Sequence, residues 1–214
     1  MKKFPLWINI IGPIGSGKTT LAKKLAELLG FEYEGEEDED ELDDYYKDPV
    51  KNSCWFQFKK LTVRFEKQRQ IMSYCSIGKE ENGIIQDEGI YEDIVFARAQ
   101  YEQGYMSEKE YKTYLRMNKA LLNCLHEPDV IVFLDATPEQ SSERIKARNR
   151  SCESNISMDY LRLLYKLYLE EIEKIPKTSL VIKLKYDNFR NADEMAKIIK
   201  EEYYSNKNVK KIGY

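Results

Sequence analysis

The chain has 214 residues, a length that suits a single domain. Its 42% hydrophobic content can fill a core, while its 33% charged content exceeds the share of about 25% usual in soluble proteins. The formal net charge is −3, which argues against a nucleic-acid-binding protein because such proteins usually carry a basic surplus. We therefore expect no nucleic-acid partner.

The cysteines and the N-terminal segment indicate in which cellular compartment the protein is expected. The four cysteines lie far apart without metal-ligand spacing, and the single histidine, His126, cannot complete a zinc set. We expect reduced thiols, as in cytoplasmic proteins. The apolar run near the N-terminus stops at Gly12, too early for a signal peptide, and no segment has the length and apolar character of a membrane span. The sequence thus predicts a cytoplasmic protein with no membrane association.

The first elements in chain order are those of an α/β fold. An unbroken apolar run predicts a strand at 6–11 that is buried on both faces. Apolar residues at helical spacing predict a helix over 19–29, which Gly30 ends, and a short strand is expected at 31–33. The very acidic run at 34–44 is predicted to be mostly a solvated loop.

The remaining elements alternate in the same way. Ser107 with Glu110, and Thr137 with Gln140, are capping boxes that mark helix starts. We expect further strands at 84–86, 130–134 and 179–184, and helices at 52–77, 91–102, 107–125, 157–175 and 192–203, with another helix after Thr137. The fold class predicted is therefore α/β, with a five-stranded parallel sheet flanked by helices. Residues 1–204 are expected to form one domain, with a lid at about 144–156 and a polar, frayed tail at 205–214.

A phosphate-binding loop lies between the first strand and the first helix. The eight residues match the pattern G-x-x-x-x-G-K-[ST] and are followed by Thr20: Gly12, Pro13, Ile14, Gly15, Ser16, Gly17, Lys18 and Thr19. The glycines let backbone N–H groups turn toward phosphate oxygens, Lys18 reaches the β- and γ-phosphates, and the Thr19 hydroxyl binds Mg²⁺. The loop predicts a protein that binds ATP or a close relative.

Three arginines narrow the class of P-loop protein. No N-K-x-D string typical of GTPases is found, and motor ATPases are usually longer. Arg144 and Arg148 are one helical turn apart, and Arg150 follows. Arginines on a mobile lid neutralise charge in the transition state of a kinase. The alternative for this cluster alone is a solvated basic end of a helix.

Spaced motifs then carry a more specific resemblance. The stretch Tyr45-Tyr46-Lys47-Asp48-Pro49 is followed at family spacing by Gln57 and Arg64. The stretch at 86–93 reads Q-D-E-G-I-Y-E-D and resembles the Q-D-R-S-I-Y-E-D of deoxynucleoside kinases. The lid pattern R-x-x-x-R-x-R, with Glu153 after it, also matches. From Trp7 to Ile175 the chain resembles a deoxynucleoside kinase, especially the bacterial deoxyadenosine or deoxyguanosine type.

The resemblance implies roles for individual residues. Asp87 helps to hold Mg²⁺, and Gln57 hydrogen-bonds the base. Arg64 and Asp93 pair near the far edge of the base, and Phe96 stacks on it. Glu153 meets the sugar 3′-hydroxyl, while the arginines Arg144, Arg148 and Arg150 hold phosphates.

The presumed catalytic base departs from the family pattern. The family has a glutamate followed by proline after its second strand, and that glutamate takes the proton of the 5′-hydroxyl. Glu34 falls at this position, but Gly35 replaces the proline. Glu36 and Glu37 are alternatives in the same acidic run, and we favour Glu34.

The second departure is Asp87-Glu88-Gly89 in place of the family's D-R-S. A glutamate reverses the charge beside the nucleotide, and loss of one such contact lowers catalysis about a hundredfold. Another cation can substitute, with Arg69 or Arg98 as candidates. A different, positively charged acceptor would also explain Glu88, as would a weak or inactive relative that binds nucleotide for another purpose.

The function expected from these features is ATP-dependent phosphoryl transfer to the 5′-hydroxyl of a purine deoxynucleoside, with Mg²⁺. The family resemblance also implies a homodimer. The alternatives are a catalytically weak or inactive nucleotide-binding protein and a P-loop kinase with another small-molecule acceptor.

Overall fold

Five parallel strands form one sheet in the order β2-β3-β1-β4-β5. The computed structural model describes residues 6–35, 41–77, 83–150, 153, 156–175, 178–185 and 192–210. The strands are β1 (Leu6–Ile11), β2 (Glu32–Glu34), β3 (Gly83–Asp87), β4 (Val130–Asp135) and β5 (Leu180–Lys185). Ile10 of β1 pairs with Asp87 of β3 and with Val132 of β4, so the carboxyl ends of the central strands lie together. The predicted five-stranded parallel sheet is confirmed, and its strand bounds shift by one residue at most ends.

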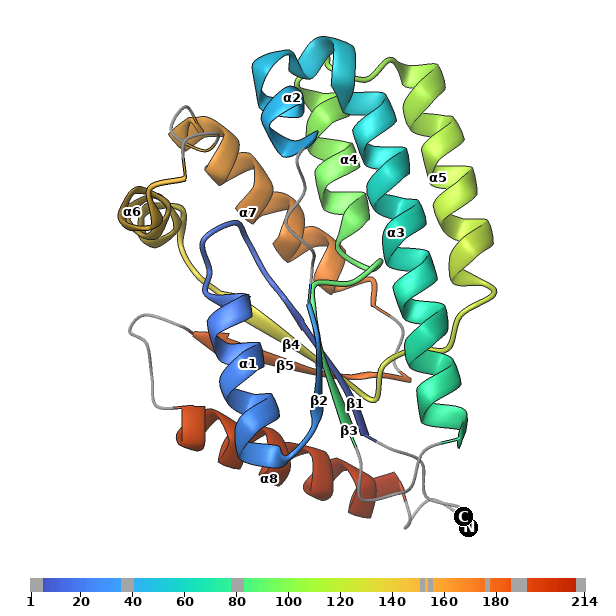
Figure 1. Ribbon diagram of the computed structural model, residues 1–214, viewed down its shortest axis with the longest axis vertical. Helices are drawn as coiled ribbons and strands as arrows, with labels where there is room; N and C mark the ends of the chain where they lie inside the picture. Colours follow the sequence, from blue (N-terminus) through green and yellow to red (C-terminus); the bar gives the residue numbers. More distant parts are fainter. Residues whose placement is uncertain are drawn as a thin grey trace.

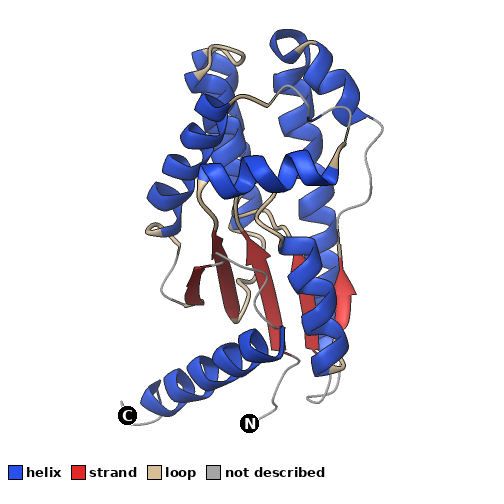
Figure 2. Ribbon diagram, turned by 90° about the vertical axis from the view of Figure 1, so that its left-hand side faces the viewer, coloured by secondary structure: helices blue, strands red, loops and turns tan. Residues whose placement is uncertain are grey.

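Helices cover both faces of the sheet (Figures 1 and 2). One face packs against α1 (Lys18–Leu29) and α8 (Ala192–Lys210). The other face packs against α4 (Asp93–Glu102) and α7 (Met158–Ile172), with α3 (Pro49–Ile77) and α5 (Glu108–Leu122) forming an outer layer. The short helices α2 (Glu41–Lys47) and α6 (Pro138–Arg148) lie toward the end of the sheet where the P-loop begins.

Alternation along β1 explains how one strand serves two cores. Ile8 and Ile10 are fully buried against α1 and the neighbouring strands. Trp7 packs on Ile71 of α3, and Ile11 joins the core under α7. A strand that is buried on both faces needs apolar side chains at nearly every position. Residues 6–11 accordingly are apolar except for Asn9.

Two helices, α3 and α4, begin two or three residues away from the position expected from the sequence. α3 begins at Pro49 rather than at 52, because an Asp48 carboxylate oxygen accepts a hydrogen bond from the Lys51 N–H (3.1 Å) and caps the first turn. α4 begins at Asp93 rather than at 91, because residues 89–92 form a turn in which the Glu92 N–H donates to the Gly89 carbonyl (3.2 Å).

Two segments are helical where loop or tail was expected. Within the acidic run, residues 41–44 belong to α2, because Tyr45 at its end is buried and stacks on Phe56 with ring centroids 4.7 Å apart. Residues 36–40 lie outside the described part of the chain. α8 continues to Lys210, past the predicted end at 203, because no glycine or proline occurs before Gly213. In the part of the chain that the structure describes, no helix is long and apolar enough to cross a membrane.

Candidate active site

A cavity of about 620 Å³ opens beside the P-loop. Its walls come from the P-loop, α2, α3, α4 and α6, together with Glu153 and Tyr160. Most of the residues predicted for nucleotide or substrate binding line this one cavity: Ile14, Gly15, Ser16, Gly17, Lys18, Thr19, Thr20, Gln57, Arg64, Asp93, Phe96, Arg144, Arg148, Arg150 and Glu153. Residues that lie far apart in the sequence, from Ile14 to Glu153, therefore meet at one site, which is what a donor site joined to an acceptor site requires.

The P-loop geometry follows from its glycines. Gly12 comes directly after β1, and a Cβ there would lie 2.9 Å from the Leu134 carbonyl oxygen, so only glycine fits against β4. Gly17 has φ 96° and precedes the first turn of α1, whose N–H groups have no side-chain cap. Lys18 folds back over the loop and donates to the carbonyl oxygens of Gly12 (2.7 Å) and Pro13 (3.2 Å). Such a loop presents backbone N–H groups and an ammonium to an anion.

Asp87, the last residue of β3, lies beside the start of α1. Its carboxylate accepts hydrogen bonds from the hydroxyls of Thr19 and Tyr33, the latter at 3.3 Å. The Oδ1 atom is buried and has no hydrogen-bond partner among the described residues. Burial, and then the neighbouring Glu88 carboxylate, raise the pKa of Asp87. A hydroxyl oxygen beside an unsatisfied carboxylate oxygen is the kind of ligand set that a hard cation takes.

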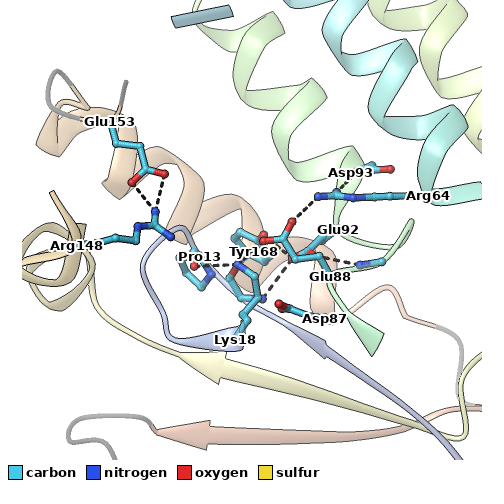
Figure 3. A network of polar contacts seen from close by, with 12 residues as sticks. Pro13, Lys18, Arg64, Asp87, Glu88, Glu92, Asp93, Arg148, Glu153 and Tyr168 are labelled. Atoms are coloured by element: carbon cyan, nitrogen blue, oxygen red, sulfur yellow. Dashed lines mark hydrogen bonds and ion pairs between the residues drawn. The ribbon is translucent and has the colours of Figure 1, made fainter. Parts of the chain in front are cut away.

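Glu88 connects the two halves of the site (Figure 3). Its Oε1 atom lies 2.9 Å from the Lys18 Nζ, and its Oε2 atom accepts a hydrogen bond from the Arg64 guanidinium. Neither of the two arginines considered as substitute cations, Arg69 and Arg98, lies beside Glu88. Arg98 pairs with three glutamates on α4 and α7, Arg69 is exposed on α3, and neither lines the cavity. The cations beside Glu88 are thus Lys18 and Arg64, because α3 presents Arg64, rather than Arg69, to the cavity.

Residues from α3 and α4 form the opposite end of the cavity. Arg64 pairs with Asp93, and these side chains are 5% and 1% exposed. Gln57, buried on the same face of α3, and Phe96 of α4 line the same space, and Phe96 meets Tyr168 edge-on with ring centroids 6.1 Å apart. The structure thus brings together the four residues for which a role in base binding was predicted; the role itself stays a prediction.

The arginines of α6 reach toward the P-loop. Arg144 donates to the Ser16 carbonyl oxygen at 2.8 Å, which ties α6 to the loop. Arg148 donates to both carboxylate oxygens of Glu153, at 2.5 Å to Oε1, and Arg150 lies 3.9 Å from Glu153 Oε1. Of the expected lid at 144–156, residues 151, 152, 154 and 155 lie outside the described part of the chain.

Glu34 ends β2 but does not line the cavity. Its Oε1 atom lies 3.2 Å from the ammonium of Lys67 on α3, which also donates to the Gly35 carbonyl oxygen. The alternative bases, Glu36 and Glu37, lie outside the described residues.

Several site residues were missed by the sequence analysis. Tyr45, Tyr46, Phe56, Lys60 and Tyr160 also line the cavity. The Tyr45-Tyr46 pair after an acidic run was a signal that could have been used, because two adjacent aromatics seldom belong to a solvated loop. The other three are indistinguishable by spacing from core or surface residues of their helices.

Glu92 was also not predicted from the sequence, although its carboxylate holds the P-loop and the turn at 89–92 together. Its carboxylate accepts hydrogen bonds from Gly12 N (3.3 Å), Gly89 N (3.3 Å) and the Tyr168 hydroxyl (2.7 Å). Burial, followed by repulsion from Glu88, raises the pKa of Glu92 to about 8. This residue joins the start of the P-loop to the turn that carries Glu88.

A parallel sheet with a P-loop after its first strand, a strand-end aspartate beside it and the arginines of α6 at the same cavity defines a P-loop phosphotransferase. The model of the deoxynucleoside kinase family matches residues 8–209. The chain belongs to the deoxynucleoside kinase family, and the activity of this family is the phosphorylation of a nucleoside.

Individual relatives agree with this assignment. A deoxyadenosine kinase from Dictyostelium discoideum is 40% identical over 92% of this chain and 79% of its own length. A deoxyguanosine kinase from the same organism is 34% identical over 88% of this chain and 67% of its own length. Among solved structures, a deoxyadenosine kinase from M. mycoides with dCMP and a flexible dCDP bound superposes with a TM-score of 0.80 at 25% identity, covering 94% of this chain and 100% of the other.

Proposed function

We propose that this protein transfers the γ-phosphoryl group of ATP to the 5′-hydroxyl of a purine deoxynucleoside. The observation that carries the proposal is the continuity of one cavity from the P-loop to Gln57 and Phe96. The P-loop end offers an ammonium and backbone N–H groups to phosphates, and the far end offers an amide and an aromatic face to a base. Purine preference is supported by the names of the two Dictyostelium relatives.

The residues divide between the two substrates. Lys18 and the P-loop backbone hold the phosphates of ATP, and Arg144, Arg148 and Arg150 close over them. Gln57 hydrogen-bonds the base, the buried pair Arg64–Asp93 meets its far edge, and Phe96 stacks on it. Glu153 binds the sugar hydroxyl once Arg148 turns from it to the phosphates.

Thr19 and Asp87 are the residues that would hold Mg²⁺. The unsatisfied, buried Oδ1 atom of Asp87 beside the Thr19 hydroxyl supports this fit. Mg²⁺ supplies charge neutralisation at the β- and γ-phosphates when it is bound.

We also propose that the protein is cytoplasmic and forms a homodimer. The dimer is supported by exposed apolar residues on the long helices α3 and α5, which are Val50, Trp55 and Met117. Light scattering of the purified protein tests the dimer.

The test of function is a transfer assay with γ-labelled ATP and Mg²⁺ against each natural deoxynucleoside and ribonucleoside. We expect 5′-monophosphates, with deoxyadenosine or deoxyguanosine giving the highest kcat/KM. Preference for a pyrimidine would correct the substrate class. Absence of transfer to every nucleoside at high enzyme concentration would leave the chain a nucleotide-binding relative without kinase activity.

A further inference from the structure

Facing residues of α3 and α4 lie in successive levels along the cavity, because the two helices run in opposite directions. At one level Arg64 pairs with Asp93, and Arg64 also binds Glu88 beside the P-loop. Earlier in α3 and later in α4, the Ser53 hydroxyl donates a hydrogen bond to Gln100 Oε1 (3.2 Å). The cavity-lining residues between these two levels are those proposed to bind the base, Gln57 and Phe96. The contact of Ser53 with Gln100 therefore lies beyond the proposed base site, on the side away from Glu88.

The amide of Gln100 holds two tyrosines that come from two other helices. Gln100 is fully buried, and its Nε2 donates to the hydroxyl of Tyr45 on α2 and to the hydroxyl of Tyr160 on α7, the latter at 3.1 Å. The two tyrosine hydroxyls are also hydrogen-bonded to each other. Burial raises the pKa of Tyr45 to about 12, so its hydroxyl stays neutral and needs hydrogen-bond partners rather than a counter-ion. One side chain thus joins α2, α3, α4 and α7.

Tyr45 and Tyr160 belong to the wall of the cavity, whereas Gln100 does not line it. The Tyr45 ring stacks on Phe56 with centroids 4.7 Å apart and meets Tyr46 at 4.9 Å, and both of these rings line the cavity too. A shift of Tyr45 would therefore move a continuous aromatic wall. Gln100 influences a bound ligand through the tyrosines that it holds.

We propose that Gln100 is a positioning residue of the acceptor site and holds Tyr45 and Tyr160 where they contact the bound nucleoside. The proposal rests on the kinase function proposed above. A primary amide suits this place, because its two N–H groups and its oxygen serve three hydroxyl groups at once. An apolar side chain of the same size would leave those hydroxyls buried without partners, and they would move to find others. A wall that has moved fits the nucleoside less well.

The position of the network predicts which property depends on it. It lies beyond the base site on the side away from Glu88, so the phosphates of ATP at the P-loop lie at the other end of the cavity. Loss of the Gln100 amide should therefore weaken nucleoside binding and leave ATP binding and the chemical step nearly unchanged. A merely structural glutamine would instead affect both substrates alike, through the stability of the whole fold.

The experiment compares Gln100→Met with Gln68→Met. Gln68 is the matched control, because it is a buried glutamine of α3 that does not line the cavity and whose amide has no hydrogen-bond partner among the described residues. Calorimetry measures the Kd of ATP and of the nucleoside with the highest kcat/KM, and steady-state assays measure kcat. We expect Gln100→Met to raise the nucleoside Kd about tenfold, with ATP Kd and kcat within about threefold of wild type. Gln68→Met should leave all three within about twofold.

Two further variants test the route through the tyrosines. Gln100→Glu should return the nucleoside Kd to within about threefold of wild type, because the hydroxyl hydrogens can rotate to donate to a carboxylate of the same length. Tyr45→Phe, which keeps the ring and removes the hydroxyl, should raise the nucleoside Kd about threefold. In the double variant of Gln100→Met with Tyr45→Phe, the nucleoside Kd should be no higher than in Gln100→Met, because both changes break the same contact.

The outcomes separate this proposal from the proposed function. An unchanged nucleoside Kd in Gln100→Met overturns the proposal while the kinase function stands, and so does an equal rise of the nucleoside Kd and the ATP Kd. A Gln100→Glu variant that folds and recovers no affinity, or effects that multiply in the double variant, also overturn it. If Gln100→Met shows no cooperative melting, Tyr45→Phe and Tyr160→Phe decide, and an unchanged nucleoside Kd in both rejects the proposal. A wild-type protein that phosphorylates no nucleoside overturns the proposed function and this proposal together.

Discussion

The Glu88 carboxylate and the Lys18 ammonium form an ion pair of 2.9 Å in which both side chains are mostly buried. Burial by itself lowers the pKa of Lys18, but the carboxylates of Glu88, Glu92 and Asp87 outweigh it and raise that pKa above its ordinary value. The lysine of the P-loop is therefore held charged by acidic residues beneath and beside it. Removal of either partner leaves a charge that the other was compensating.

Lys18→Met should distinguish the contribution of the Lys18–Glu88 ion pair to activity from its contribution to stability. Loss of the ammonium should lower kcat/KM by about 10²-fold or more, as removal of a preorganised donor does. It should also cost about 3 kcal/mol of stability, because the Glu88 carboxylate is left with Arg64 alone. Addition of Glu88→Gln to Lys18→Met should restore part of the stability and none of the activity. Urea unfolding of both single variants and the double variant measures the coupling, and additive costs would count against this account.

A side chain at position 89 would meet the buried amide of Asn9. A Cβ at position 89 would lie 2.7 Å from Asn9 Nδ2, and the Asn9 amide is buried with no hydrogen-bond partner among the described residues. Gly89→Ser, which restores the family residue, should therefore cost about 1–3 kcal/mol. Asn9→Ala should recover at least half of that cost by opening the space.

The control for this pair is Gly104→Ser. Gly104 has φ 76° and open space around its Cβ position, so its cost comes from backbone strain alone. Asn9→Ala should leave the cost at position 104 unchanged. Chemical unfolding of the wild type, the three single variants and the two double variants decides the matter, and equal costs of Gly89→Ser with and without Asn9 would show that the contact is unimportant.

Asp87→Asn should raise stability while it lowers activity. The carboxylate is disfavoured by burial and by repulsion from Glu88, which together raise its pKa, so a neutral amide relieves both. We expect a higher melting temperature near pH 8, with kcat lower by about 10²-fold and a weaker dependence on Mg²⁺. Asp135→Asn is a matched control, because Asp135 ends β4 in the same way but accepts its hydrogen bond from Tyr165 (2.8 Å). A lower melting temperature for Asp87→Asn would contradict the inferred electrostatic strain.

Local sequence patterns were sufficient to predict the fold class and the phosphate-binding end of the site. Apolar runs located the three central strands β1, β3 and β4, because strands buried on both faces need apolar residues at successive positions. The capping boxes at Ser107 and Thr137 gave two helix starts that the structure reproduces with both reciprocal hydrogen bonds. The P-loop pattern located the anion-binding turn, because its glycines are required by short-range backbone geometry.

The contacts that sequence patterns could not supply join residues far apart in the chain. The pair Lys67–Glu34, the contact of Asn9 with Gly89, and the hydrogen bond from Tyr168 to Glu92 leave no local periodicity. The direction of the Glu88 side chain was equally hidden, because it depends on a left-handed φ at a position where the sequence shows no glycine. These long-range contacts decide how the two ends of the site are joined, and only the folded structure reveals them.

Glu92 provides the last prediction, a dependence of stability on pH. Its pKa in the folded protein is about 8, raised from an ordinary 4.5 by burial. Between these two values the folded state binds more protons at Glu92 than the unfolded state does, so this residue makes stability fall as pH rises. The contribution reaches at most about 1.4 kcal/mol for each pH unit within that window. Glu92→Gln removes the titration, so the difference in unfolding free energy between variant and wild type should move in favour of the variant from pH 5 to pH 8.

The control for Glu92 is Tyr168→Phe, which removes one hydrogen bond to the carboxylate and leaves it able to titrate. Because that bond favours the charged form, its loss should raise the pKa of Glu92 in the folded protein further and extend the loss of stability to higher pH. Urea unfolding at intervals from pH 5 to pH 9 gives all three curves. If the wild type and Glu92→Gln keep a constant difference across this range, Glu92 stays ionised in the folded protein, and Lys18 and Arg64 then compensate its burial in full.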